Sequence, residues 1–176
     1  MSTVIASVDR RSPAQLAGIK PGEQLLTING HEIIDVLDYR FYGYDADSHL
    51  TLREPNGAQR AVHIRKQEGQ DLGLNFDTYL MDEMRSCANH CIFCFVDQMP
   101  PGMRQTLYFK DDDARLSFLL GNYITLTNLT EREAQRIIDL HICPINVSVH
   151  TTDPQLHCTM LGNKNAGRSL EYIRAF

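Results

Sequence analysis

The first seventy residues alternate short apolar runs with turn-forming residues, the pattern of small strands around short helices. Ser12 and Pro13 favour a helix start and Gly18 favours a left-handed exit, so a short helix is expected at 12–18. The other expected elements are a strand at 25–28, an Asn29-Gly30 hairpin turn, a strand at 31–33, a helix within 35–44, and strands at 50–52 and 61–64 around a turn at 55–57. This region is therefore expected to be a small β-rich domain.

From residue 72 onward the pattern becomes an alternation of strands and helices, which is typical of parallel α/β structure. Leu72, Leu74 and Phe76 alternate with polar residues and predict a first strand, which would end at the loop that follows. Further strands are expected at 122–127 and 145–150, a helix after Thr130 with Glu133 at capping-box spacing, and helical segments after Asp153 and over 167–176. Sites of parallel barrels lie beyond the carboxyl ends of their strands, which makes Thr127, Asn128 and His150 candidate positions.

Composition narrows the class of protein. The chain has 176 residues, 17 basic and 22 acidic, with a net charge of -5, so no nucleic-acid partner is expected. No stretch is long and apolar enough for a membrane span, and residues 1–8 lack the order of a secretory signal, so we expect a cytoplasmic protein. A closed (β/α)8 barrel needs about 200 to 250 residues, so any barrel here must be incomplete.

Three of the five cysteines, Cys87, Cys91 and Cys94, lie within eight residues in the spacing C-x3-C-x2-C. In a reducing compartment such clustered thiols favour metal binding over disulfides. A structural zinc site usually has four ligands in two short pairs, and a second such pair is missing from the sequence; His90, His141, Cys143, His157 or Cys158 could complete it only if the fold brought them close. An iron–sulfur cubane has four irons, so three thiolates leave one iron open for an external chelator. The spacing alone leaves both alternatives open.

The segment from Ser12 to Gly30, SPAQLAGIKPGEQLLTING, resembles bacterial, circularly permuted PDZ domains. Residues 71–76, DLGLNF, resemble the glycine loop with which PDZ domains offer backbone amides to a peptide carboxylate beside a strand-addition groove. The resemblance implies peptide binding by Gly73, Leu74 and Phe76. The alternative is that Gly73 only permits a turn and that the apolar neighbours belong to the core.

The cysteine motif, with the aromatic Phe93 before its last cysteine, resembles the radical S-adenosylmethionine (SAM) superfamily. That resemblance implies that Cys87, Cys91 and Cys94 hold a 4Fe-4S cluster, that SAM chelates the fourth iron, and that Phe93 lies near the SAM adenine. Many members carry Gly-Gly-Glu at the end of the second strand. Thr127 and Asn128 stand there instead, and they are assigned to SAM binding by position, with a purely structural strand-end turn as the alternative. His150 is expected to face SAM or substrate, again with a structural role as the alternative.

Residues 87–128 resemble a bacterial group of PDZ-linked iron–sulfur oxidoreductase-like proteins of unassigned reaction, whose members are longer than this chain. The implied fold is α/β, with a PDZ-like domain at 1–70, its glycine loop extending to 76, and the N-terminal part of an incomplete (β/α) radical SAM barrel at 71–176. The implied function is reductive cleavage of SAM to a 5'-deoxyadenosyl radical, with a reductant such as ferredoxin or flavodoxin and an unknown substrate. We do not expect this length of chain to turn over substrate alone. The alternative is a PDZ-like peptide-binding adaptor with a structural metal loop.

Two further segments lie outside these motifs. Asp111, Asp112 and Asp113 are expected to solvate a turn, because three successive side chains diverge. His157 stands where the similar proteins are expected to carry an arginine, so this chain departs from the resemblance at that position.

Overall fold

The computed structural model describes residues 3–176; residues 1 and 2, with which the expected PDZ-like domain begins, lie outside it. The chain divides into two compact units, one ending at Glu83 and the other spanning Met84–Phe176, whereas the sequence suggested a division after residue 70. Within the described residues no helix is long and apolar enough to cross a membrane.

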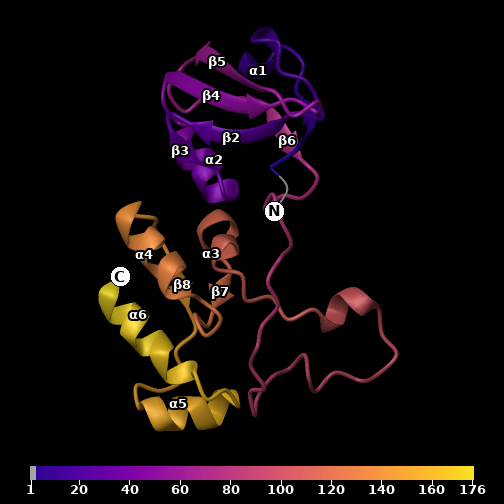
Figure 1. Cartoon of the computed structure of the whole chain (residues 1–176). Coiled ribbons are helices and arrows are strands. Elements are labelled where there is room, and N and C mark those ends of the chain that lie inside the picture. Colours follow the sequence, from indigo (N-terminus) through magenta and orange to yellow (C-terminus); the bar gives the residue numbers. More distant parts are fainter. Residues whose placement is uncertain (1–2) are drawn as a thin grey trace. The chain divides into compact units, whose positions relative to one another are not determined.

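The N-terminal unit is built from two antiparallel sheets and two short helices (Figure 1). Its larger sheet has the strand order β3-β2-β4-β5, and its smaller sheet pairs β1 with β6. The elements are β1 (Ile5–Val8), α1 (Pro13–Leu16), β2 (Gln24–Ile28), β3 (His31–Glu32), α2 (Val36–Tyr42), β4 (Asp47–Arg53), β5 (Gln59–Arg65) and β6 (Leu74–Phe76).

Turn chemistry places these elements as the sequence predicts. The Ser12 side chain accepts a hydrogen bond from the Gln15 amide and caps α1, and Gly18 follows with a φ of 77°. Asn29 and Gly30 have φ values of 51° and 82°, as the tight turn between β2 and β3 requires. The expected short helix and hairpin turn are therefore confirmed.

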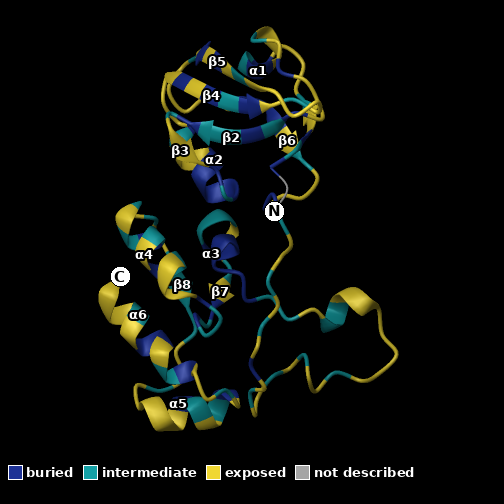
Figure 2. Ribbon diagram, in the orientation of Figure 1, coloured by how far each residue is buried: buried dark blue, intermediate teal, exposed yellow. Residues whose placement is uncertain are grey.

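Along the two longest strands, β4 and β5, more buried side chains alternate with more exposed ones (Figure 2). Leu50, Leu52 and Ile64 face the core, while His49 and His63 face solvent. The period of two thus gives this sheet one apolar face and one polar face.

The expectation that residues 72–76 form the first strand of a parallel barrel is wrong. Strand β6 pairs antiparallel with β1, with Phe76 opposite Ile5 and Leu74 opposite Val8. Alternation of apolar and polar residues predicts a half-buried strand but does not specify its partner. The partner is decided by long-range packing, which places this strand in the N-terminal unit.

The second unit contains a short parallel sheet with helices around it (Figure 1). Strands β7 and β8 pair in parallel, Tyr123 with Asn146 and Ile124 with Val147, and both are shorter than expected. The elements are η1 (Gln105–Tyr108), α3 (Ala114–Leu120), β7 (Tyr123–Ile124), α4 (Glu131–Asp139), β8 (Asn146–Val147), α5 (Pro154–Leu161), η2 (Ala166–Arg168) and α6 (Ser169–Ala175). This confirms α/β content, and among the described residues of this unit the parallel sheet comprises these two strands.

The core of this unit lies between the strands and helices α3, α4 and α6. Its buried members are Ala114, Ile124, Leu126, Leu129, Ala134 and Ile137. The predicted capping box of α4 is present: the Thr130 side chain accepts from the Glu133 amide, and the Glu133 carboxylate accepts from the Thr130 amide.

Helix α3 was not expected, and the expectation that the three aspartates solvate a turn is wrong. Asp112 and Asp113 have exposed fractions of 1% and 0%. Asp113 caps α3 by accepting from the Arg115 amide, and Gly121 ends the helix with a φ of 77°. The side chains of the aspartates do point in different directions, but Asp112 and Asp113 find hydrogen-bond partners inside the unit and are therefore buried instead of facing solvent.

Candidate metal centre and cofactor site

The cysteine loop, residues 84–112, has little regular secondary structure of its own and is held at both ends by backbone hydrogen bonds. The Cys87 amide donates to the Lys110 carbonyl at 2.6 Å. The amides of His90 and Ile92 donate to the last carbonyls of α5, those of Leu161 and Met160, at 2.8 and 3.0 Å. The segment that carries the first two cysteines is thereby anchored to a helix far along the chain.

Gly162 makes this anchoring possible. It ends α5 with a φ of 58°, and a Cβ atom at this position would lie 2.5 Å from the His90 carbonyl oxygen. A backbone atom cannot turn aside as a flexible side chain can. The close approach of the cysteine loop to α5 therefore requires glycine here.

Asn89 connects the loop to the end of β7 and to the turn after α5. Its side chain is 1% exposed. The amide nitrogen donates to Thr125 Oγ1 at 3.0 Å, and the amide oxygen accepts from Thr127 Oγ1 at 2.9 Å and Asn163 Nδ2 at 2.8 Å. A buried amide with three partners fixes the backbone between Cys87 and Cys91.

Asp112 continues this network. Its carboxylate accepts from the amide and the hydroxyl of Thr125, both at 2.6 Å. Burial raises the pKa of Asp112, and the two hydrogen bonds from Thr125 oppose that rise. Asp112, Thr125 and Asn89 thus form a hydrogen-bonded chain, buried at Asp112 and Asn89, that joins the residues before α3 to those after β7 and to the cysteine loop.

The three loop thiols are partly buried and close enough to influence one another. Burial raises the pKa of Cys91, and the neighbouring Cys87 and Cys94 raise it further. Lys110 supplies a positive charge beside them: its ammonium donates to the Asn89 carbonyl at 2.9 Å and to Asp97 at 3.0 Å, and it interacts electrostatically with Cys87 and Cys94. Thiolates at this position would therefore be stabilised by a fixed cation.

The cysteine loop offers three thiols, the number of ligands taken by a cubane with one open iron. Among residues 3–176, no group of three metal-binding side chains with donor atoms within 4.8 Å of one another includes a loop cysteine. A cubane holds each thiolate on a different iron, so its ligands stand further apart than the ligands of one ion. Cys158 is already engaged, since its thiol donates to the Lys164 carbonyl and accepts from the Gly167 amide. Cys143 is exposed.

The structure brings together Phe93, placed near SAM by resemblance, and His150, expected at a strand end to face SAM or substrate. Their ring centroids are 4.6 Å apart, and His157 lies 6.0 Å beyond His150. His157 is 1% exposed, neither ring nitrogen has a hydrogen-bond partner among the described residues, and burial lowers its pKa. An unsatisfied buried ring of this kind is unusual and marks a position that a polar ligand would complete.

Thr127 and Asn128 hold the cysteine loop with their side chains. Thr127 donates to Asn89, and the Asn128 amide donates to the Ser86 carbonyl at 3.2 Å. Leu126, just before them, has a φ of 59°, an uncommon value for a leucine, and turns the chain at the end of β7. Thr127 and Asn128 also line a pocket of about 550 Å³ with Arg132 and Arg168. Their assignment to SAM stays a prediction.

The glycine loop of the N-terminal unit uses its amides internally. The Gly73 amide donates to the Asp71 carboxylate at 2.6 Å, and the Leu74 amide donates to the Tyr39 hydroxyl at 3.3 Å. That hydroxyl donates to Asp71 at 3.0 Å, and burial raises the pKa of Tyr39. The Tyr39 ring also packs edge-on against Phe76. Peptide capture by Gly73, Leu74 and Phe76 stays a prediction, and a peptide carboxylate would have to displace Asp71.

Gly73 has a structural reason to be glycine. Its φ is 82°, and a Cβ atom there would lie 2.3 Å from the Ser12 Cβ. The neighbouring Leu72 carbonyl accepts from the Ala14 amide, so the loop packs directly on the start of α1. Packing against Ser12 is therefore enough to explain why this residue is glycine, as the structural alternative to peptide binding predicts.

Sequence reasoning missed the polar network behind the cysteines, namely Asn89, Asp112, Thr125 and Asn163, and the close packing at Gly162. One signal was available: Asp113 and Gly121 bracket an apolar segment as a helix cap and a helix exit, which would have predicted α3 and the burial of its start. The contacts of Asn89 join residues up to 74 positions apart, and no local pattern encodes them.

Comparison with protein families gives two matches. The model of a radical SAM-like domain matches residues 66–176, and the model of a PDZ domain matches residues 4–53. A search of curated proteins finds no match.

Proposed function

Because the chain belongs to the radical SAM-like domain family, we propose that its second unit binds a 4Fe-4S cluster and SAM and serves the reductive formation of a 5'-deoxyadenosyl radical. The observation that carries the proposal is the anchored loop with three partly buried, mutually interacting thiols. Three thiolates suit a cluster with one iron left for an outside ligand.

Cys87, Cys91 and Cys94 would hold the cluster. When bound, such a cluster supplies one electron to SAM, and that electron cleaves a carbon–sulfur bond. The protein's own part is to fix the loop: Asn89 holds the middle of the first cysteine interval, and the backbone bonds of His90 and Ile92 to α5 hold its second end. Preorganisation of this kind spares the loop from reordering when the ligands bind.

Lys110 would balance negative charge at the thiolates. Three thiolates on a cluster leave the assembly anionic, and each further electron adds to that charge. The ammonium of Lys110 is held in place by Asn89 and Asp97 and cannot swing freely. A fixed cation beside the sulfurs favours the reduced state of the centre.

Phe93, His150 and His157 would form one wall of the SAM site. Phe93 immediately precedes Cys94 and contacts the ring of His150. Near His150 lies the ring of His157, whose nitrogens have no hydrogen-bond partner among the described residues. An aromatic face suits a nucleobase, and a buried imidazole suits a polar group of the cofactor. The electron would come from a small redox carrier such as ferredoxin or flavodoxin.

Anaerobic reconstitution with iron and sulfide tests the cluster. We expect about four irons and four sulfides for each chain in the wild type. Cys91→Ala should lose most of the iron, whereas Cys143→Ala, which removes an exposed thiol outside the loop, should retain it. A colourless product with stoichiometric zinc, or equal iron in both variants, contradicts the proposal.

Electron paramagnetic resonance of the reduced protein tests SAM binding. Addition of SAM should change the spectrum of the wild type, because an outside ligand alters the environment of one iron. His157→Leu should weaken this response while leaving the iron content unchanged. A spectrum that SAM does not alter at saturating concentration contradicts the SAM part of the proposal and leaves the cluster part standing.

A further inference from the structure

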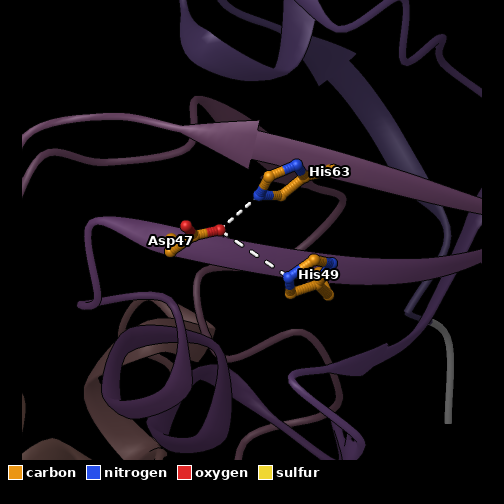
Figure 3. A group of neighbouring side chains, drawn as sticks. All are labelled: Asp47, His49 and His63. Atoms are coloured by element: carbon orange, nitrogen blue, oxygen red, sulfur yellow. Dashed lines mark hydrogen bonds and ion pairs between the residues drawn. The ribbon is translucent and has the colours of Figure 1, made fainter.

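A second set of metal-binding side chains lies on the exposed face of the N-terminal sheet, in the part of the chain that carries none of the loop cysteines. Asp47 and His49 project from β4, and His63 projects from the adjacent β5 (Figure 3). One ligand atom from each of the three lies within 4.8 Å of the other two. All three residues are exposed, so an ion could reach them from solvent.

Strand pairing creates this cluster. His49 and His63 are directly opposite each other in the antiparallel register, where side chains of one face stand about 5 Å apart. Asp47 lies two positions before His49 and therefore projects from the same face. The seven-residue pairing of β4 with β5 holds all three backbones in place.

The side chains already converge on one carboxylate oxygen. His63 Nε2 is hydrogen-bonded to Asp47 Oδ1, and His49 Nε2 lies 3.7 Å from the same oxygen. The two imidazole rings are stacked, with centroids 4.3 Å apart and planes within 3° of parallel.

We propose that Asp47, His49 and His63 form a binding site for a divalent transition-metal ion of the zinc type. Two imidazole nitrogens and one carboxylate oxygen are borderline donors that suit such ions, whereas Mg²⁺ and Ca²⁺ prefer oxygen ligands throughout. Zinc bonds of about 2.0–2.1 Å in a tetrahedral site place neighbouring donors about 3.3 Å apart. Small side-chain rotations achieve this, since the rings are exposed.

Three protein ligands leave at least one coordination position open to water or to a group from another molecule. Arg65 is the competing cation: its Nε lies 3.7 Å from the second Asp47 oxygen. This contact is exposed, and exposed ion pairs contribute little. A divalent ion with three ligands therefore displaces it readily.

Nuclear magnetic resonance of the histidine rings in the full-length chain tests the site, because it separates these residues from the cysteine loop. Titration with Zn²⁺ should shift the ring signals of His49 and His63 in a saturable way. His49→Gln should weaken the response of His63 by about tenfold or more, as losses around metal ligands typically do. Backbone amide spectra of each variant establish that it is folded.

His31→Gln is the matched control, because His31 is an exposed histidine of the same unit that stacks on Tyr42. This variant should bind Zn²⁺ at Asp47, His49 and His63 as the wild type does, and Mg²⁺ should shift neither ring signal. Signals of His49 and His63 that do not move with excess Zn²⁺, or that move equally in folded His49→Gln, overturn the proposal. Neither outcome depends on the cluster in the other unit.

Discussion

Gly162, just after helix α5, lies against the backbone of the cysteine loop. A Cβ atom there would meet the His90 carbonyl oxygen at 2.5 Å, in a backbone conformation that alanine already disfavours. We expect Gly162→Ala to destabilise the second unit by about 2–4 kcal/mol, the sum of about 1 kcal/mol for the left-handed φ and about 1–3 kcal/mol for the overlap. Urea denaturation monitored by circular dichroism measures this.

Gly121→Ala is the control for that substitution. Gly121 also ends a helix of the second unit with a left-handed φ, but a Cβ atom there would have only the Asn146 side chain nearby, at 3.7 Å. Gly121→Ala should lower the unfolding free energy by about 1 kcal/mol. Equal losses in the two variants would mean that the His90 contact is unimportant.

Lys110 offers a second prediction at this scale, which rests on the proposed cluster. Lys110→Gln removes the cation beside the thiolates, so the reduction potential of the proposed cluster should become more negative by tens of millivolts. For one electron, about 1 kcal/mol corresponds to roughly 40 mV. Lys110→Arg keeps the charge and should shift the potential less. Potentiometric titration of the reconstituted protein measures both, and an unchanged potential in Lys110→Gln contradicts the assignment.

Helix α3 owes its start to one buried carboxylate. Asp113 accepts from the Arg115 amide and forms a buried ion pair with the Arg115 guanidinium, with a 2.6 Å contact from Nη2. Burial opposes the charge of Asp113, but the hydrogen bond from Arg115 prevails and its pKa is lowered. Replacing it removes a cap and leaves a buried cation without this carboxylate.

The lowered pKa gives this element a pH dependence of definite sign. A carboxylate with a folded pKa below its unfolded value of about 3.9 stabilises the protein above that value, and the contribution is lost as pH falls through the folded pKa. Asp113→Asn keeps a capping side chain but not the charge. The unfolding free energy of Asp113→Asn should be about 3 kcal/mol lower than that of the wild type at pH 7, and the difference should shrink below about pH 4. Urea denaturation across pH 3–7 tests this, and a deficit independent of pH would refute it.

In the whole molecule, the segment before α3 has little regular secondary structure and carries the three cysteines that would hold the proposed cluster. It depends on a few anchoring hydrogen bonds, and Arg104 within it is exposed. If the proposed cluster binds, its removal should accelerate tryptic cleavage after Arg104 by roughly tenfold, because the open form becomes more populated. Cleavage after the exposed Arg53 in the N-terminal unit serves as the internal control. Equal cleavage rates with and without iron would count against the cluster as an organiser of this loop.

Local chemistry predicted the elements better than their partners. The helix cap at Ser12, the turn at Asn29-Gly30 and the capping box at Thr130 are each decided within four residues, and each is present. Strand β6 was assigned to the wrong sheet because alternation carries no information about the neighbouring strand. Helix α3 was missed because Asp113, its N-cap, is the last of three successive aspartates that were interpreted as a solvated turn.

The sequence by itself determined the chemistry that this chain offers: three thiols at fixed spacing, the turn residues of the N-terminal unit and the family to which the cysteine motif points. Tertiary structure alone decided which side chains meet. Asn89 reaches Asn163, His49 faces His63, and Phe93 lies against His150 because distant segments are paired or packed. The reason is physical: covalent neighbours set residue types and local dihedral angles, whereas contacts between distant residues depend on burying apolar surface throughout each unit.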